Sequence, residues 1–279
     1  NKKSVICKFT NLVSQSKFFE KIIIERNLKA IPVIKSKKIY GALFSIKKKP
    51  KETPILIMAG GKGKRLLPLT LNIPKPLIKI DNKPMLQHLI ESIKIENFKN
   101  IFISINHFGV QIKKFTNSIN FTDLNIRFVE EKKPLGTAGP LSLIKDKVFD
   151  NIIIVNADII TDLKLEKIMN FHNDNKSDLT IGCLVYEYQI PFGVVSLKKN
   201  KYNSIEEKPL IKRLVNCGIY VLNKNVIQLT QKNQSISMVK LIDRANKKKK
   251  KISIFPMHEN WIDVGSKENL KKARDQFVK

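Results

Sequence analysis

The sequence predicts an α/β protein with a mostly parallel, mixed β-sheet flanked by helices. From residue 54 onward, short apolar runs of strand length alternate with stretches whose apolar side chains recur at helical spacing. Repeated β-α-β units of this kind form a largely parallel sheet with helices on both faces. Because ligands of such sheets bind beyond the carboxyl ends of the strands, the residues that follow each strand are the candidates for function.

The elements of this sheet follow one another in a regular order. Strands are expected at 54–59, 100–106, 125–130 and 151–158, and helices near 84–97, 110–117 and 138–145. The chain of 279 residues is 42% apolar, which suffices for one large core beside a small second unit.

The first 49 residues are expected to form that second unit. Helical spacing over 15–27 predicts a helix, and 30–34 and 38–44 are typical of short strands. The charged segment "KKKPKETP" then indicates a linker, so we expect domains at 1–49 and 50–279. The helix and "IPVI…KIYGALF" resemble half of a CBS module. The resemblance implies a partial CBS-like α+β unit, and because CBS motifs work in pairs, we expect a structural or docking role over adenosine-phosphate sensing.

The formal charge of +28 is spread along the whole chain, and only six of the 52 basic residues are arginine. No zinc-finger spacing or aromatic RNA-binding motif accompanies the lysines. We therefore expect a solvated basic surface that attracts anionic substrates, and no nucleic-acid partner.

Membrane and secretory signals are also absent from the sequence. No apolar run reaches the roughly 20 residues of a membrane span, and the first residues lack the apolar core of a secretory signal. The three cysteines have neither zinc-site spacing nor an even number for disulfides. We expect a cytoplasmic protein with no membrane partner, and self-association stays open.

A glycine-rich loop follows the first predicted strand of the larger unit. The loop consists of Ala59, Gly60, Gly61, Lys62, Gly63, Lys64 and Arg65, and its spacing matches neither the P-loop nor the dinucleotide fingerprint. Glycines let the backbone approach a polyphosphate closely, and amides at the start of the next helix point at its charge. The loop is therefore predicted to bind phosphate.

Lys75 follows between Pro74 and Pro76. The two prolines predict an extended segment that cannot enter a helix, so that Lys75 is presented in a fixed position. Either half of the motif alone is consistent with a turn and a surface lysine. The combined spacing, GGxGxRLxPLTxxxPKPL, is highly specific.

Residues 54–272 resemble the sugar-phosphate nucleotidyltransferases, in which a sugar 1-phosphate is joined to a nucleoside triphosphate. The motifs "PLGTAGPL", "NADIITD" and "HENWIDVG" are most similar to CBS-linked hexose-1-phosphate guanylyltransferases and GDP-mannose pyrophosphorylases. The resemblance implies a Rossmann-like nucleotidyltransferase fold. It also implies a nucleotide site made of the residues Ala59, Gly60, Gly61, Gly63, Lys64, Arg65, Glu131, Leu135, Gly136 and Thr137.

The base is expected next to Glu131. A carboxylate can accept hydrogen bonds from the ring N–H and the exocyclic amine of guanine, whereas an amide suits uracil or thymine. This chemistry favours GTP, and UTP or dTTP stays as the alternative.

Two aspartates are implied as ligands of Mg²⁺. Asp158 follows the strand of "NIIIVNADIITD", and Asp263 lies in "WIDVG". Two carboxylates that share Mg²⁺ with triphosphate oxygens are the expected arrangement for this hard cation.

The residues that are implied to bind the sugar phosphate lie between these two aspartates in the sequence. The resemblance assigns it to Gly193, Glu207, Lys208 and Asn216. Glu207 and Asn216 can bond sugar hydroxyls, and Lys208 can neutralise the 1-phosphate.

The expected activity is a Mg²⁺-dependent displacement with a nucleoside triphosphate and a hexose 1-phosphate as partners. Mannose 1-phosphate and glucosamine 1-phosphate are both candidates, and the implied role is the supply of GDP-activated hexoses for surface glycans. Arg65, Lys75, Asp158 and Lys208 are the expected catalytic residues. A non-catalytic regulatory subunit that binds nucleotide sugars, and a nucleic-acid-binding protein, are the rival hypotheses.

Overall fold

The computed structural model describes residues 7–8, 31–35, 38–43, 50–119, 121–144 and 149–277. The chain divides into two compact units, Asn1–Lys49 and Pro50–Lys279. In the first unit, β1 (Cys7–Lys8) pairs in parallel with β2 (Ile31–Lys35), which pairs antiparallel with β3 (Lys38–Leu43). The helix expected over 15–27 lies outside the described residues.

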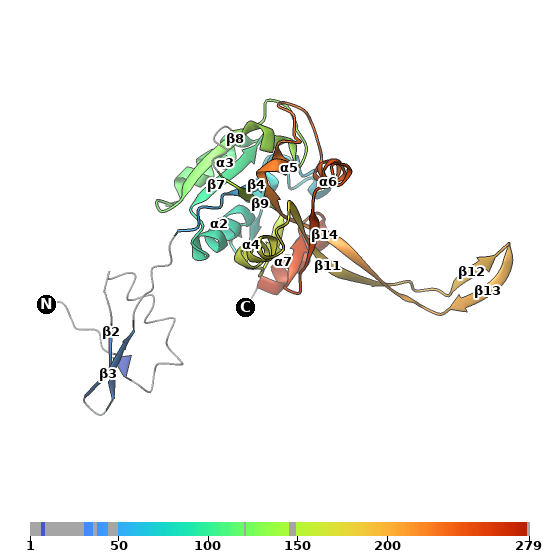
Figure 1. Ribbon diagram of the computed structural model, residues 1–279, viewed down its shortest axis with the longest axis horizontal. Helices are drawn as coiled ribbons and strands as arrows, with labels where there is room; N and C mark the ends of the chain where they lie inside the picture. Colours follow the sequence, from blue (N-terminus) through green and yellow to red (C-terminus); the bar gives the residue numbers. More distant parts are fainter. Residues whose placement is uncertain are drawn as a thin grey trace. The chain divides into compact units, whose positions relative to one another are not determined.

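The second unit is built on a seven-stranded mixed sheet in the order β15-β11-β14-β9-β4-β7-β8. The sheet consists of β4 (Ile55–Met58), β7 (Asn100–Ile105), β8 (Asn125–Glu130), β9 (Asn151–Asn156), β11 (Leu179–Gln189), β14 (Leu210–Asn223) and β15 (Ile252–Pro256). Only β14 is antiparallel to its neighbours in this sheet. The predicted mostly parallel sheet is confirmed (Figure 1).

Helices cover both faces of the sheet (Figure 1). The helices of the second unit are α2 (Met85–Ile95), α3 (Gly109–Ser118), α4 (Leu165–Asp174), α5 (Lys224–Ile227), α6 (Met238–Lys247) and α7 (Lys267–Phe277). Side chains of α2, α3 and α4 belong to the core on one face, and those of α5 and α6 belong to the core on the other. None of the helices in the described part of the chain is long and apolar enough to cross a membrane.

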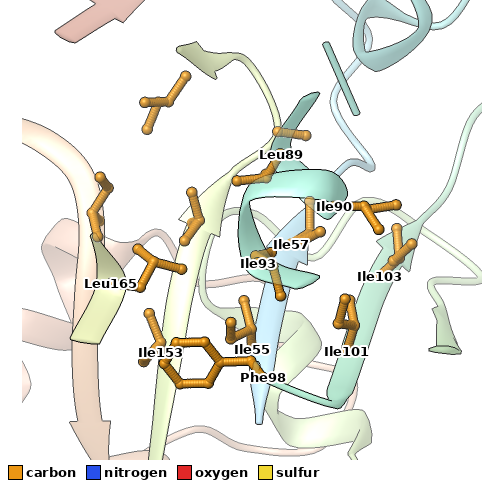
Figure 2. Close-up of a cluster of buried hydrophobic side chains, with 14 of the residues drawn as sticks. Ile55, Ile57, Leu89, Ile90, Ile93, Phe98, Ile101, Ile103, Ile153 and Leu165 are labelled. Carbon is orange, nitrogen blue, oxygen red and sulfur yellow. The ribbon is translucent and has the colours of Figure 1, made fainter. Parts of the chain in front are cut away.

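The central strand β4 is buried on both faces. Ile55 and Ile57 point into one core, and Leu56 points into the other. Because side chains alternate along a strand, this continuous apolar run can lie only at the centre of a covered sheet. Figure 2 shows Ile55 and Ile57 packed beside Ile90 and Ile93 of α2. The recurrence of apolar residues along α2 at helical spacing turns that side of the helix toward the strand.

Two short elements differ from the expectation. The helix expected near 138–145 is a single 3₁₀ segment, η4 (Gly139–Leu143). Lys75 does not lie in an extended segment, because it begins the 3₁₀ turn η3 (Lys75–Leu77). Pro74 is extended and precedes the turn, and Pro76 lies within its first positions, where a missing N–H costs no helical hydrogen bond. The expectation of an extended Lys75 was therefore wrong.

The remaining strands are short or lie outside the main sheet. They are β5 (Lys79–Ile80) paired with β6 (Lys83–Pro84), β10 (Ile159–Thr161) paired with β16 (Trp261–Asp263), and β12 (Val194–Lys198) paired with β13 (Lys201–Glu206). Each pair is antiparallel. The β10–β16 pair matters most for the site, because it brings together two distant parts of the chain.

Candidate active site

The candidate active site lies at the carboxyl edge of β4 and β9. The chain continues from β4 to β7 on one side of the sheet, whereas β9 is the neighbour of β4 on the other side. Such a topological switch point is where open α/β sheets bind their ligands. The glycine-rich loop leaves β4 at this point, and Asp158 follows β9 at the same edge.

The glycine-rich loop is held tightly at its far end. Gly63 has a φ of 62°, and a Cβ atom placed on it would lie 3.1 Å from Cβ of Lys75. The left-handed conformation and this contact both require glycine. The buried Thr70 hydroxyl donates a hydrogen bond of 2.9 Å to the carbonyl of Gly63. Lys75 is therefore packed directly against the loop.

Lys75 connects the loop to both aspartates. Its ammonium group donates to Oδ2 of Asp158 and lies 4.0 Å from Oδ1 of Asp263. The side chain of Lys75 is only 11% exposed, so its charge is little screened by water. The lysine lies where it can contact a ligand that is held by both acids and the loop.

The β10–β16 pair explains how the two acids meet. Ile159 lies opposite Asp263 in the strand register. The amide of Val264 donates a hydrogen bond of 3.0 Å to the carbonyl of Asp158. Burial raises the pKa of the Asp263 carboxyl, and the nearby Asp158 raises it further, against the opposite effects of Lys75 and Arg65. Asp158 and Asp263, which are far apart in the sequence, thus form one acidic pair with two cationic side chains beside it.

Arg65 completes this cluster from the short 3₁₀ turn η2 (Lys64–Leu66). A Cβ atom placed on Gly265 would lie 2.8 Å from Nη1 of Arg65, so the guanidinium group rests against the backbone just after Asp263. Lys64 precedes Arg65 and is exposed, as are Gly61 and Lys62 earlier in the loop. The cluster is thus Arg65, Lys75, Asp158 and Asp263.

Glu131 lies beside the opposite end of the loop. A Cβ atom placed on Gly60 would lie 2.6 Å from Oε1 of Glu131, and Ala59 before it is buried. The other carboxylate oxygen, Oε2, accepts a 2.8 Å hydrogen bond from the amide of Leu135. Burial of this carboxyl raises the pKa of Glu131. One carboxylate oxygen therefore faces the loop while the other is held in place.

The segment after Glu131 packs against the start of α6. The Leu135 side chain is buried, and a Cβ atom placed on Gly136 would lie 2.7 Å from the carbonyl of Ile236. The hydroxyl of Thr137 accepts a 2.8 Å hydrogen bond from the amide of Met238. These contacts fix the segment from Leu135 to Thr137 next to Glu131.

The four sugar-phosphate candidates are divided between two places. Asn216 stays at the sheet, where its Oδ1 accepts a 2.9 Å hydrogen bond from the amide of Gly218, and Gly218 lies against Asn156 at the end of β9. Gly193, Glu207 and Lys208 lie together far out on the hairpin formed by β11 and β14. A Cβ atom placed on Gly193 would lie 2.9 Å from Oε2 of Glu207. The structure does not bring these three residues to the Lys75–Asp158 pair of the same chain.

The roles of some residues in the site could not be predicted from the sequence motifs. Thr70 supports the loop, Gly265 contacts Arg65, and Asn106 donates a 2.7 Å hydrogen bond to the carbonyl of Glu131. Thr70 and Gly265 do lie within the quoted motifs, "PLT" and "WIDVG". Their partners, however, depend on contacts between distant segments.

The donor set of the cluster fits a divalent metal. Oδ1 of Asp263 is buried and has no hydrogen-bond partner within the described residues. Asp158 supplies a second carboxylate next to it, and Mg²⁺ takes one or two carboxylates and completes its shell with phosphate and water. Among the residues that the structure describes, no group of three or more His, Cys, Asp or Glu side chains could hold a metal.

A covered, mostly parallel sheet with a glycine-rich loop at its switch point defines the class of α/β nucleotide-binding proteins. Residues 55–279 match the sequence model of the family described as "Nucleotidyl transferase", and the chain belongs to this family. The resemblance to sugar-phosphate nucleotidyltransferases is thereby confirmed.

Several relatives have names that describe the same type of reaction. A probable mannose-1-phosphate guanylyltransferase 2 of Arabidopsis thaliana is 33% identical over 75% of this chain and 61% of its own length. A mannose-1-phosphate guanyltransferase of Yarrowia lipolytica is 32% identical over 77% of this chain and 61% of its own length. The chain thus spans about three fifths of the length of these relatives.

Solved structures share the fold. The crystal structure of HddC from Yersinia pseudotuberculosis matches with a TM-score of 0.65 and 27% identity, over 81% of this chain and 99% of HddC. The same protein complexed with GMP-PN matches with a TM-score of 0.64. These matches confirm the α/β nucleotidyltransferase fold of the second unit.

Proposed function

We propose that the second unit joins a hexose 1-phosphate to a nucleoside triphosphate, with GTP favoured, and releases pyrophosphate. The convergence of Arg65, Lys75, Asp158 and Asp263 beside the glycine-rich loop carries this proposal. Two cations and a pair of acids at one point suit a triphosphate with its metal better than a neutral ligand.

The chemistry is an in-line displacement at the α-phosphorus. An oxygen of the sugar 1-phosphate forms the new P–O bond while the bond to the β-phosphate breaks, and pyrophosphate leaves with the electron pair. The attacking oxygen is already ionised, so no general base is needed. Catalysis then consists of positioning and charge stabilisation, with Arg65 and Lys75 on the triphosphate and Lys208 on the incoming phosphate.

Asp158 and Asp263 are proposed to hold Mg²⁺. When bound, the ion would neutralise phosphate charge and polarise the phosphoryl group. The buried Oδ1 of Asp263, which has no hydrogen-bond partner in the described part of the chain, supports this assignment. The nucleotide is proposed to contact the loop Ala59–Arg65, Glu131 and the segment Leu135–Thr137.

Guanine is favoured by two independent observations. One oxygen of the fixed Glu131 carboxylate faces the loop, where it can accept from the guanine edge. The names of the relatives from Arabidopsis and Yarrowia describe guanylyl transfer to mannose 1-phosphate, and HddC was crystallised with GMP-PN. Mannose 1-phosphate is accordingly the first sugar to test, and a product of this kind would serve surface glycan synthesis.

Pyrophosphate release tests the proposal. The full chain with Mg²⁺ is assayed against GTP, ATP, UTP and dTTP, each combined with mannose, glucosamine and glucose 1-phosphates. We expect release with GTP and one hexose 1-phosphate. If no pair of substrates releases pyrophosphate, the enzyme hypothesis is wrong and a regulatory subunit is favoured. Tight oligonucleotide binding with a steep salt dependence would favour the nucleic-acid hypothesis.

For the first unit we propose a partial CBS-like module without a sensing role. The three-stranded sheet β1-β2-β3 supports it. Addition of AMP or ATP is expected to leave turnover and thermal stability unchanged. A saturable shift in either quantity would contradict the proposal.

A further inference from the structure

The hairpin formed by β11 and β14 continues beyond the sheet as a long two-stranded ribbon, which we call the arm (residues 185–214). Figure 1 shows the arm leaving the sheet and ending in β12 and β13. Every residue of β12 and β13 is exposed, and so are the last five residues of β11. A two-stranded ribbon alone is only marginally stable in water, so the arm is expected to have a partner.

The register places exposed apolar side chains on both faces of the arm near its root. Tyr186 and Tyr188 lie on the same face, with their ring centroids 6.4 Å apart, and Ile211 is opposite Tyr188. Tyr186 is 52% exposed and Tyr188 is 46% exposed. The opposite face carries the Glu187–Lys212 ion pair. The exposed apolar residues on that face are Val185, Leu210 and Leu214.

At the tip, large apolar side chains gather on one face. Val195 pairs with Ile205 and Leu197 pairs with Tyr202, and all four are exposed. Leu197 and Tyr202 are 67% and 68% exposed. Ser196 and Ser204 are paired on the other face. Alternation of this kind is typical of strands that bury one face, and large apolar side chains that gather on one exposed face indicate an interaction surface.

The arm also carries three of the four sugar-phosphate candidates. Six residue steps separate Asn216 from Leu210 within β14, which is roughly 20 Å of extended strand, and Glu207 and Lys208 follow further along the arm. The residues that the proposed reaction requires at Lys75 are thus held well away from the Lys75 of their own chain.

The arm cannot fold back without losing its backbone pairing. The ladder runs from Leu179 opposite Leu222 to Gln189 opposite Leu210. It continues through the hydrogen bond from Ile190 N to Pro209 O (3.1 Å) and into the β12–β13 pair. This continuous pairing holds the arm extended, away from the site of its own chain.

We propose that two copies of this chain exchange arms, so that Gly193, Glu207 and Lys208 of one copy complete the Lys75–Asp158 site of the other. The inference rests on the proposed function, because that function requires a sugar-phosphate group next to the triphosphate. A second copy of this chain fits as the partner, because its own site lacks the same three residues and could receive them from the arm. In a two-fold dimer both copies present the same exposed apolar side chains, so the root and the tip of the arm can bury them against the partner.

Sedimentation tests the dimer without reference to activity. At about 0.15 M salt, where surface charges are screened within roughly 8 Å, the full chain is expected to be a dimer. The variant Leu197→Lys/Tyr202→Lys is expected to be a monomer, whereas the matched variant Ser196→Lys/Ser204→Lys on the other face stays dimeric. A monomeric wild type, or a dimer unaffected by Leu197→Lys/Tyr202→Lys, would overturn the arm exchange.

Complementation tests the delivery of site residues. Two differently tagged copies are co-expressed, one with Asp158→Asn and the other with Lys208→Ala, and the heterodimer is purified through both tags. Exchanged arms leave one complete site, so about half of the wild-type turnover is expected, although each variant homodimer is at least about 10²-fold impaired. If each arm served its own chain, this heterodimer would be as inactive as the homodimers.

The reciprocal heterodimer gives the opposite result. It combines a wild-type copy with a copy that carries both Asp158→Asn and Lys208→Ala. Arm exchange predicts an inactive protein, and about half of the turnover would contradict it. If the wild type releases no pyrophosphate with any substrate pair, the proposed function fails and the delivery of site residues fails with it, while sedimentation still decides the arm-mediated dimer.

Discussion

The guanidinium group of Arg65 lies against the α-carbon of Gly265, which follows Asp263 by two residues. A Cβ atom at position 265 would lie 2.8, 2.9 and 3.0 Å from Nη1, Nη2 and Cζ of Arg65. Glycine at this position therefore determines where the arginine charge lies relative to the two aspartates.

Gly265→Ala is expected to lower turnover by on the order of 10²-fold, because the added methyl group displaces a charge that must be positioned closely. The melting temperature should change little, since the atoms that must move are the end of a flexible, exposed side chain. Gly41→Ala, where no atom lies within 4 Å of the added carbon, is the control. Steady-state pyrophosphate release and thermal unfolding measure both quantities. Unchanged turnover in Gly265→Ala would remove Arg65 from the proposed mechanism.

Lys75→Gln is expected to reduce turnover by about 10²-fold or more, because it removes a preorganised charge from the triphosphate site. The exposed Lys83, whose Nζ lies 2.9 Å from Oε2 of Glu91, provides the control Lys83→Gln, which should keep full turnover. In a double-mutant cycle, Lys75→Gln and Asp158→Asn should be non-additive in thermal stability, because the two residues are directly bonded. Additive effects would show that the ion pair contributes nothing to the fold.

Glu131→Gln is expected to shift the preference of the enzyme from GTP toward UTP or dTTP. The amide oxygen can still accept from the amide of Leu135, but the amide NH₂ replaces an acceptor with a donor beside Gly60. The ratios of kcat/KM for the triphosphates measure the shift. Glu130→Gln, which changes an exposed neighbour that pairs with Lys113, should leave these ratios unchanged.

Glu131→Gln should also change how the stability of the protein depends on pH. Because burial raises the pKa of Glu131, the folded protein binds this proton more tightly than the unfolded chain does. The contribution of Glu131 to wild-type stability therefore falls as pH rises through the raised pKa, and Glu131→Gln lacks this loss. The melting temperature of the variant relative to the wild type should rise from pH 4.5 to pH 7, and a constant difference would contradict the burial of the charge.

Asp263 is expected to control the metal requirement. Its raised pKa means that acidification protonates this carboxyl earlier than an ordinary aspartate, and a protonated carboxyl is a poor Mg²⁺ ligand. The Mg²⁺ concentration for half-maximal turnover should therefore rise as pH falls toward that pKa. In Asp263→Asn the requirement should be high at every pH. Identical pH dependence in both proteins would assign the effect to substrate phosphate instead.

The sheet was predictable because its signals are local. β7 is a largely apolar run and β8 alternates polar and apolar residues, and the structure ends both within a residue of the expected limits. η4 was expected as a helix because its apolar spacing is helical, but Pro140 and the short length allow only one 3₁₀ segment. At Lys75 the prolines were interpreted as helix breakers, although the start of a 3₁₀ turn tolerates them.

The site was predictable only in part for a different reason. Motif order places Gly60, Lys75 and Asp158 after the correct strands, and the switch point then brings them to one edge of the sheet. The contacts of Thr70 and Gly265 depend on packing between distant segments, which no spacing rule encodes. Likewise, "EEKP" and "PFGVV" indicate a role for Glu207 and Gly193 but not how far the arm carries them from Asn216.

Lys75 and Arg65 lie beside Asp158 and Asp263, so this cluster is balanced in charge before any ligand arrives. Each acid already has a cation nearby, so the fold needs no counter-ion to assemble the cluster. In the proposed function, ligand entry is an exchange of partners, in which the basic side chains leave the carboxylates for the phosphates. Chelation should consequently stop turnover while the folded protein keeps its melting temperature.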